Sequence, residues 1–249
     1  MFVAASTECY AGRSLPAAFE KLTDLEFSSV EVALHAGGRQ LTPAQVAADM
    51  EQAVALCRDT HRLNLVAYSV EIDASGEEYY RQFAACCRLA KATKVVTLTV
   101  PSGEIGTPFN EEVERLRKLV AIATLDSARV SIRSQVGRLS QDPDTVVVLC
   151  DNVKGLGVTL DPSHYVCGPH AGRSYDQLMK YVYHVHLRDT TRENLQVRVG
   201  QGDIDYGRLI NQLRKFHYQR ALSVNIAPMP DVDHDVELRK IRLLLDSLI

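Results

Sequence analysis

Short apolar runs that are rich in β-branched residues alternate along the chain with longer segments that have one apolar face. Such short runs are typical of strands buried on both faces, as in a parallel sheet that helices cover. They predict eight strands, at Phe2–Ser6, Ser29–Leu34, Leu63–Val70, Val95–Val100, Arg129–Arg133, Gly157–Asp161, Tyr181–Leu187 and Ala221–Ile226.

The longer segments between these runs carry apolar residues three and four positions apart. In Thr42–His61, for example, Val46, Met50, Val54 and Cys57 follow this spacing. It places them on one face of a helix. The same pattern predicts helices at Asn110–Leu125, at Tyr206–Phe216 and over the C-terminal segment from Leu238 to Leu248.

Helix-start signals agree with these limits. Thr42-Pro43 and Asp142-Pro143 each place a capping side chain before a proline, and Asp205 can cap the helix at 206–216. Strands and helices that alternate in this way predict an α/β fold, a single (β/α)8 TIM barrel over residues 1–249. A doubly wound open sheet is the alternative, but no GxGxxG turn follows the first predicted strand.

Composition narrows the classes of function. Hydrophobic residues make up 46% of the chain and the formal net charge is −3, which suits a globular protein and argues against a nucleic-acid partner. No apolar run is long enough to cross a membrane, and the start of the chain lacks the basic residues of a secretory signal. None of the six cysteines forms a CxxC pair. We therefore expect a cytoplasmic protein whose cysteines behave as small buried hydrophobes.

The candidate chemistry lies where the predicted strands end, because the active sites of such barrels lie at the C-terminal ends of the strands. Alternation along each strand points Arg133, Asp161, His186 and Asn225 toward the same mouth, on four consecutive strands. His164 follows just above, in the loop after the sixth strand. We expect these five side chains to form one polar site.

Several motifs resemble those of one family. GVTLDPSHY at 157–165, HVHLRD at 184–189, the segment from Val199 to Asn225 that contains GQGDID, and SVEVALH at 29–35 are similar to motifs of the xylose isomerase-like sugar epimerases and isomerases. The superfamily also contains endonuclease IV. The resemblance covers nearly the whole chain and is most specific between Gly157 and Asn225.

The resemblance implies a particular metal site. Active epimerases of this family hold one divalent metal with Glu, Asp, His and Glu on strands five to eight, and the two glutamates also move the substrate proton. Asp161 and His186 match two of these ligand positions, whereas Arg133 and Asn225 stand where the two glutamates belong. Arginine does not lose its proton to become a ligand, and asparagine has no basic site. The metal and acid–base site therefore looks dismantled.

Other residues are candidates for contact with substrate. His164 and Arg198 match positions that touch substrate oxygens in relatives, and Gln135 replaces a frequent histidine. His35, Tyr68 and Glu71 are expected to line the mouth. His184 and the Gly200-x-Gly202 turn are better explained structurally, as a hydrogen-bonded core histidine and as a tight turn before a capped helix.

Two arrangements of the mouth are open from the sequence. In the first, no metal cofactor is bound and an Arg133–Asp161 ion pair fills its space, since an unpaired buried carboxylate is unfavourable. In the second, Asp161, His164 and His186 hold one divalent metal (Mn, Zn, Mg or Co) as a two-histidine, one-carboxylate set.

Three functions compete. The first is an enzyme that acts on a small sugar or sugar acid, with His164 or His186 moving a proton and Arg133 stabilising an oxyanion. The second is a non-catalytic carbohydrate-binding or regulatory protein. The third, a repair endonuclease relative, ranks last because the charge balance does not suit DNA. The partner expected in the first two is a small carbohydrate-like molecule, and the oligomeric state is left open.

Overall fold

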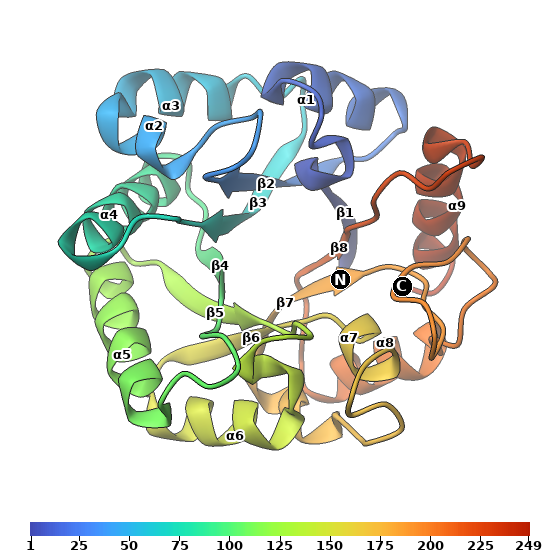
Figure 1. The fold of residues 1–249 in the computed structure, drawn as a ribbon. Coiled ribbons are helices and arrows are strands. Elements are labelled where there is room, and N and C mark those ends of the chain that lie inside the picture. The colour runs from blue at the N-terminus through green and yellow to red at the C-terminus, as the bar shows by residue number, and fades with distance from the viewer.

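The computed structural model describes residues 1–249, and the chain forms a closed barrel of eight parallel strands in sequence order. A ring of helices surrounds the barrel (Figure 1). The strands are β1 (Phe2–Ser6), β2 (Ser29–His35), β3 (Asn64–Glu71), β4 (Thr97–Pro101), β5 (Arg129–Arg133), β6 (Leu156–Leu160), β7 (Val182–Leu187) and β8 (Ala221–Val224). Every predicted strand is present, with limits within two residues of those expected. The prediction of a (β/α)8 TIM barrel is confirmed, because β1 pairs with β8 and no open edge remains.

Nine α-helices and three short 3-10 helices connect the strands. They are η1 (Thr7–Tyr10), α1 (Leu15–Asp24), α2 (Pro43–Ala48), α3 (Met50–Arg58), α4 (Gly76–Ala92), α5 (Phe109–Leu125), η2 (Leu139–Gln141), α6 (Pro143–Asn152), α7 (Ser163–Val166), η3 (Asp176–Tyr181), α8 (Tyr206–Lys215) and α9 (His234–Asp246). No helix is both long enough and apolar enough to cross a membrane.

The expected helix caps are present. Thr42 accepts from the backbone N–H of Gln45 in a reciprocal capping box, Asp142 accepts from Asp144 and Thr145, and Asp205 accepts from Arg208. The single helix predicted over Thr42–His61 is wrong, because the chain forms two helices there. Asp49 separates them: its backbone is extended and its carboxylate caps α3, a role in which aspartate satisfies N–H groups that a continuous helix would already have used.

The apolar core lies between the barrel and its helices. Residues such as Val30, Val32 and Leu34 on β2 point outward into this layer and are fully buried. Cys57, Cys86 and Cys87 lie in it as free, buried thiols, as predicted. Burial raises the pKa of the Cys86 thiol well above its usual value.

The inside of the barrel is polar instead. The hydroxyl of Thr159 lies 2.7 Å from that of Thr99 and 2.6 Å from that of Ser131, and all three are buried. TIM barrels usually fill this space with branched apolar side chains. Polar groups that are buried in this way have to satisfy one another, so their contacts fix the positions of the side chains above them.

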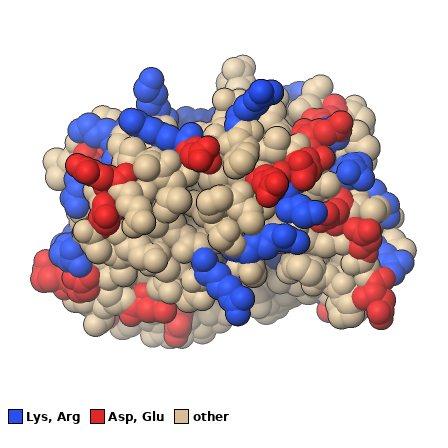
Figure 2. Space-filling model, turned by 90° about the horizontal axis from the view of Figure 1, so that it is seen from above, with Lys and Arg blue, Asp and Glu red and all other residues tan.

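The surface carries charges of both signs. On the face that α1, α2 and α3 occupy, acidic and basic side chains are interspersed around a largely uncharged centre (Figure 2). No continuous basic surface is visible on that face.

Candidate functional site

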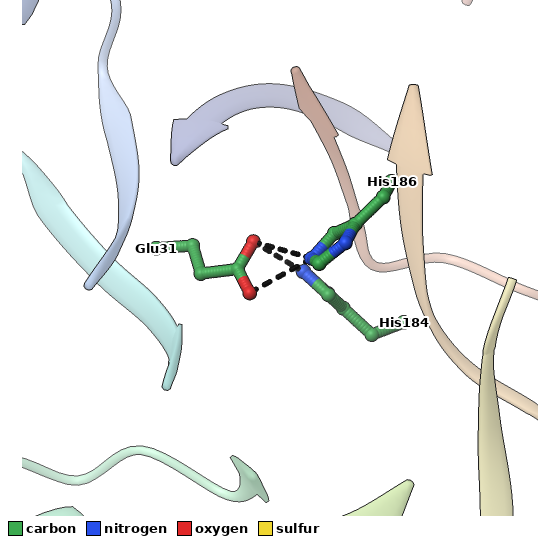
Figure 3. Close-up of side chains that lie close together, drawn as sticks. All are labelled: Glu31, His184 and His186. Atoms are coloured by element: carbon green, nitrogen blue, oxygen red, sulfur yellow. Dashed lines mark hydrogen bonds and ion pairs between the residues drawn. The ribbon is translucent and has the colours of Figure 1, made fainter. Parts of the chain in front are cut away.

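A carboxylate and two imidazoles meet at the centre of the barrel. Glu31 of β2 lies opposite His184 and His186 of β7, and the three side chains point toward one another (Figure 3). The Nε2 atom of His184 lies 3.0 Å from a Glu31 oxygen, and that of His186 lies 2.9 Å from both oxygens. Ser223 of β8 donates its hydroxyl to the same carboxylate at 2.6 Å. We call these four residues the core cluster.

The core cluster holds an ionised carboxylate away from water. Burial by itself raises the pKa of Glu31, but the two imidazoles outweigh burial and hold that pKa well below its usual range. Glu31 and His186 are fully buried and His184 is nearly so. The prediction that His184 is a hydrogen-bonded core histidine is confirmed.

Glu31 was not among the residues singled out from the sequence. The sequence did contain an indication of its role. Glu31 is the one carboxylate in the otherwise apolar run SVEVALH, and it lies an even number of residues from His35. Alternation therefore places both side chains on the inward face of the strand.

Arg133, at the end of β5, reaches past the end of β4 to β3. Its guanidinium forms an ion pair with Glu71 and donates to the side-chain oxygen of Gln135 at 3.0 Å. Burial raises the pKa of Glu71, but Arg133 and then His35 more than offset this and lower it. Arg133 is 8% exposed. Glu71 therefore neutralises a cation that is almost buried.

The predicted Arg133–Asp161 ion pair is wrong. Asp161, which is fully buried after β6, instead accepts from Arg188 at 2.9 Å and from the backbone N–H and hydroxyl of Ser163. Arg188 stands two residues after His186, so it follows the inward face of β7 and reaches Asp161 on the adjacent strand. Arg133 is long enough to pass the end of β4 and reach Glu71, which offers a second carboxylate.

His164 follows Asp161 by three residues in α7. Its Nε2 atom lies 3.7 Å from an Asp161 oxygen, and its Nδ1 atom accepts the backbone N–H of Val136 at 3.2 Å. Burial lowers the pKa of His164 to about 4, although Asp161 opposes that effect. An imidazole that accepts at Nδ1 and is neutral carries its proton on Nε2. His164 therefore presents an N–H donor beside Asp161.

The remaining expected residues lie in three different places. Asn225 donates its amide to Glu8 at 2.9 Å, and His35 lies 3.1 Å from the hydroxyl of Ser69, both at the mouth. Arg198 is exposed in the loop after β7, where it contacts the backbone of Asp231 at 3.4 Å. The placement of Tyr68 at the mouth is wrong.

Tyr68 points outward from β3 into the helix layer. Its side chain is fully buried, and its hydroxyl lies 3.0 Å from that of Thr93, the residue that ends α4. The prediction for Tyr68 was wrong because side chains alternate along a strand. Tyr68 lies on the opposite face of β3 from Ser69 and Glu71, whose side chains contact residues of the mouth.

The loop that follows β7 is fixed by Asp189. One of its carboxylate oxygens accepts from the backbone N–H groups of Gly200 at 2.7 Å and Gly202 at 3.1 Å. A side chain at Gly202 would place its Cβ atom 2.0 Å from the other oxygen of Asp189. Gly200-x-Gly202 is thus a turn that packs on Asp189, as the structural interpretation of these glycines predicted.

One group of side chains in the structure has metal-ligating geometry. The ligand atoms of Glu31, His184 and His186 all lie within 4.8 Å of one another. The trio of Asp161, His164 and His186 considered from the sequence does not form such a group, because His186 turns to Glu31. Two histidines and one carboxylate are a donor set that transition metals accept. In the structure, imidazole–carboxylate hydrogen bonds already connect the three side chains.

With the fold and these contacts established, comparison with known proteins places the chain. Residues 19–242 match the family model described as "Xylose isomerase-like TIM barrel", so the chain belongs to that family. A search of curated protein sequences gave no match.

Solved structures with the same fold include three informative neighbours. One is a xylose isomerase-like TIM barrel protein from Mycobacterium smegmatis in complex with magnesium, at a TM-score of 0.77 and 14% identity over 99% of this chain and 97% of that one. The others, each at a TM-score of 0.76 over 99% of both chains, are the 3-keto-D-glucoside 4-epimerase of E. coli at 15% identity and the probable 3-DHS dehydratase AsbF of Bacillus anthracis at 14%. At these identities the likeness shows the shared fold.

Proposed function

We propose that the C-terminal mouth of the barrel binds a small sugar or sugar acid without the metal-centred, two-glutamate proton transfer of the active epimerases. The observation that carries the proposal is the set of contacts at the four ligand positions of the family. At the positions where the resemblance places the two glutamates, Arg133 pairs with Glu71 and Asn225 donates to Glu8, and Asp161 and His186 are each engaged by another protein side chain.

The donor chemistry at these positions does not fit the family's divalent metal. Such cations prefer carboxylate oxygens, and the guanidinium of Arg133 would repel them. The amide nitrogen of Asn225 donates to Glu8, and the positive charge of Arg188 lies against Asp161. We therefore propose that no metal is held at the mouth.

The groups that remain at the mouth suit polyhydroxylated molecules. Gln135, Glu71 and His35 are partly exposed there, and their planar polar groups can pair with hydroxyls. A hollow of about 420 Å³ lies beside the mouth, between the loops after β6 and β7, and includes Arg192 and the stacked rings of Tyr165 and Tyr175. Arg133 at the mouth and Arg192 in the hollow can each also bind the carboxylate of a sugar acid.

If the protein catalyses a reaction, we propose His186 as the base. The Nδ1 atom of His186 has no hydrogen-bond partner in the structure, and in a neutral ring that donates Nε2–H to Glu31 this atom would carry the lone pair that accepts a proton. A carboxylate that orients a histidine is the arrangement that activates such bases in other enzymes. Arg133 would then stabilise the negative charge that develops on the substrate oxygen when the adjacent C–H proton moves to His186.

A non-catalytic carbohydrate-binding role is the second candidate. The pairs Arg133–Glu71 and Arg188–Asp161 occupy the mouth, and the cavity between Glu8 and His35 measures only about 20 Å³. A closed, charge-paired mouth favours recognition at its rim over reaction at its centre.

Calorimetric titration with ketohexoses, aldopentoses and hexonic acids tests the proposal. Binding that Gln135→Ala weakens and Arg192→Ala preserves would place the ligand at the mouth, and the reverse pattern would place it in the adjacent hollow. The absence of binding to every member of the panel would overturn the proposal.

Proton NMR in D₂O then separates the two candidates. Deuterium that enters the carbon next to the carbonyl of a bound sugar shows catalysis. His186→Gln should then lower the rate about 10²–10⁴-fold, the usual effect of losing a positioned base. Binding without exchange would leave the recognition role.

Metal analysis of protein purified without chelator tests whether a metal is bound. About one equivalent bound through Asp161 and His186 would refute our interpretation of the donor set.

A further inference from the structure

Another pocket lies at the opposite end of the barrel from the mouth. It has a volume of about 390 Å³ and is bounded by the N-terminal ends of β1, β4, β5 and β8, through Phe2, Thr97, Arg129 and Ala221. This volume is in the range of small-molecule sites. The N-terminal face of such barrels normally serves stability, so a pocket there calls for its own explanation. We call it the basal pocket.

The lining of the basal pocket is cationic. Lys94, from the turn before β4, Arg129, which begins β5, and Arg220, which precedes β8, all contribute to it, and no aspartate or glutamate does. None of the three cations is among the ion pairs that the chain forms. Three positively charged side chains from separate segments thus line one pocket with no acidic residue in the lining, in a protein whose net charge is −3. Repulsion among them is relieved when an anion binds.

Tyr183 gives the basal pocket a firm aromatic wall. The guanidinium carbon of Arg129 lies 5.5 Å from the centre of the Tyr183 ring, and that of Arg220 lies 6.0 Å from it. Both distances suit cation–π contact, which orients a guanidinium without neutralising it. Arg220 also donates to the backbone carbonyl of Tyr183 at 3.4 Å.

The strand beneath the ring is shaped to accept it. A Cβ atom at Gly157 of β6 would lie 2.2 Å from Cδ2 of Tyr183, so only glycine lets the ring rest there. His184, which follows Tyr183 on β7, also lines the pocket, and its ring forms a hydrogen bond with Glu31 in the core cluster. The wall and the floor of the basal pocket are therefore held by the barrel itself.

We propose that the basal pocket binds a phosphorylated small molecule. Arginine forks match phosphate oxygens in a bidentate manner and lysine adds a point charge, so Arg129, Arg220 and Lys94 together suit a dianionic phosphate. The rim supplies a place for the organic part, since the side chains of Phe2 and Val96 are 39% and 44% exposed beside Tyr183. This site is independent of the sugar site proposed at the mouth.

Calorimetry with two probes tests the proposal. Phenyl phosphate and inorganic phosphate are titrated into the full chain at low ionic strength. Phenyl phosphate should bind more tightly, because its ring can pack against Tyr183 and Phe2. Equal affinity would overturn the assignment to an organic phosphate, and the absence of binding by both probes would overturn the site.

Matched variants locate the binding. Arg129→Gln combined with Arg220→Gln should weaken phenyl phosphate by at least about tenfold, since each guanidinium supplies charge-assisted bonds. Arg239→Gln removes one positive charge from an exposed position on α9 outside the pocket and should leave affinity unchanged. If the double variant folds poorly, Lys94→Gln is a second probe of the pocket. Lys94 lies in a turn outside the barrel interior, and its replacement should also weaken phenyl phosphate. An effect of Arg239→Gln as large as that of the pocket variants would show non-specific attraction and would refute the proposal.

Discussion

Replacing Glu31 with glutamine tests the core cluster most directly. The substitution keeps the shape of the side chain and removes its charge. Glu31 accepts hydrogen bonds from His184, His186 and Ser223. A glutamine offers one acceptor oxygen and turns an N–H donor toward the others, so at least one imidazole N–H faces another donor.

The expected loss of stability follows from the burial of the group. Removing one partner from a buried charged network costs about 3–5 kcal/mol, because the groups that are left are desolvated without compensation. Glutamine keeps one acceptor, which puts the loss at the lower end, about 3 kcal/mol. For a domain of this size about 2–4 °C of Tm corresponds to each kcal/mol, so Tm should fall by roughly 6–12 °C.

Urea unfolding followed by circular dichroism, together with thermal melting, measures the loss. Glu20→Gln is the matched control, because Glu20 is exposed on α1 and makes no side-chain contact with a cation. If Glu31→Gln changes stability no more than Glu20→Gln does, Glu31 is not an ionised anchor of the barrel and the interpretation of the core cluster fails.

The same variant should show a characteristic pH dependence. The pKa of Glu31 is held well below its ordinary value of 4.5 in the folded chain. Below that ordinary value the unfolded chain takes up a proton that the folded chain does not. The stabilisation by Glu31 is therefore complete above about pH 4.5 and declines as the pH falls below it toward the folded pKa. The difference between the parent and Glu31→Gln should shrink over that acidic range.

Three further results are expected. Arg133→Glu combined with Asn225→Glu should gain Mn²⁺ binding in calorimetry, because two new carboxylates would then join Asp161 and the Arg133 cation would be gone; the same two positions changed to glutamine should show no gain. His164 should stay neutral down to about pH 4 with its proton on Nε2 in ¹⁵N NMR, and titration near its ordinary value of 6.5 would contradict its burial. Asp189→Asn should speed protease cleavage in the loop after β7 at unchanged barrel stability, and an unchanged cleavage rate would show that the loop does not depend on that carboxylate.

Much of the fold could be predicted because it depends on local periodicity. Eight apolar runs, the helical spacing between them and caps such as Thr42 and Asp142 each act over a few residues, so the chain shows them directly. The break at Asp49 was missed because the apolar stripe continues across it, whereas capping by that single carboxylate decides the geometry.

The sequence predicted where the candidate site lies in the barrel, but not which of its charged side chains pair with one another. Alternation along a strand fixes which side chains face inward, and the contacts of Arg133 with Glu71 and of His186 with Glu31 agree with it, although His186 lies at the barrel centre and not at the mouth. It says nothing of how far a long side chain reaches across a closed barrel.

The sequence by itself determined the barrel and the positions of Arg133 and Asn225 at the ends of the fifth and eighth strands. Only the tertiary structure decided which polar side chains meet: Arg133 with Glu71, Arg188 with Asp161, and Glu31 with two histidines. Closure of the barrel brings β2 across from β7, although more than a hundred residues separate them along the chain, and β4 alone lies between β3 and β5. Electrostatic partners are selected by distance in space and by burial, and neither quantity is encoded by local spacing.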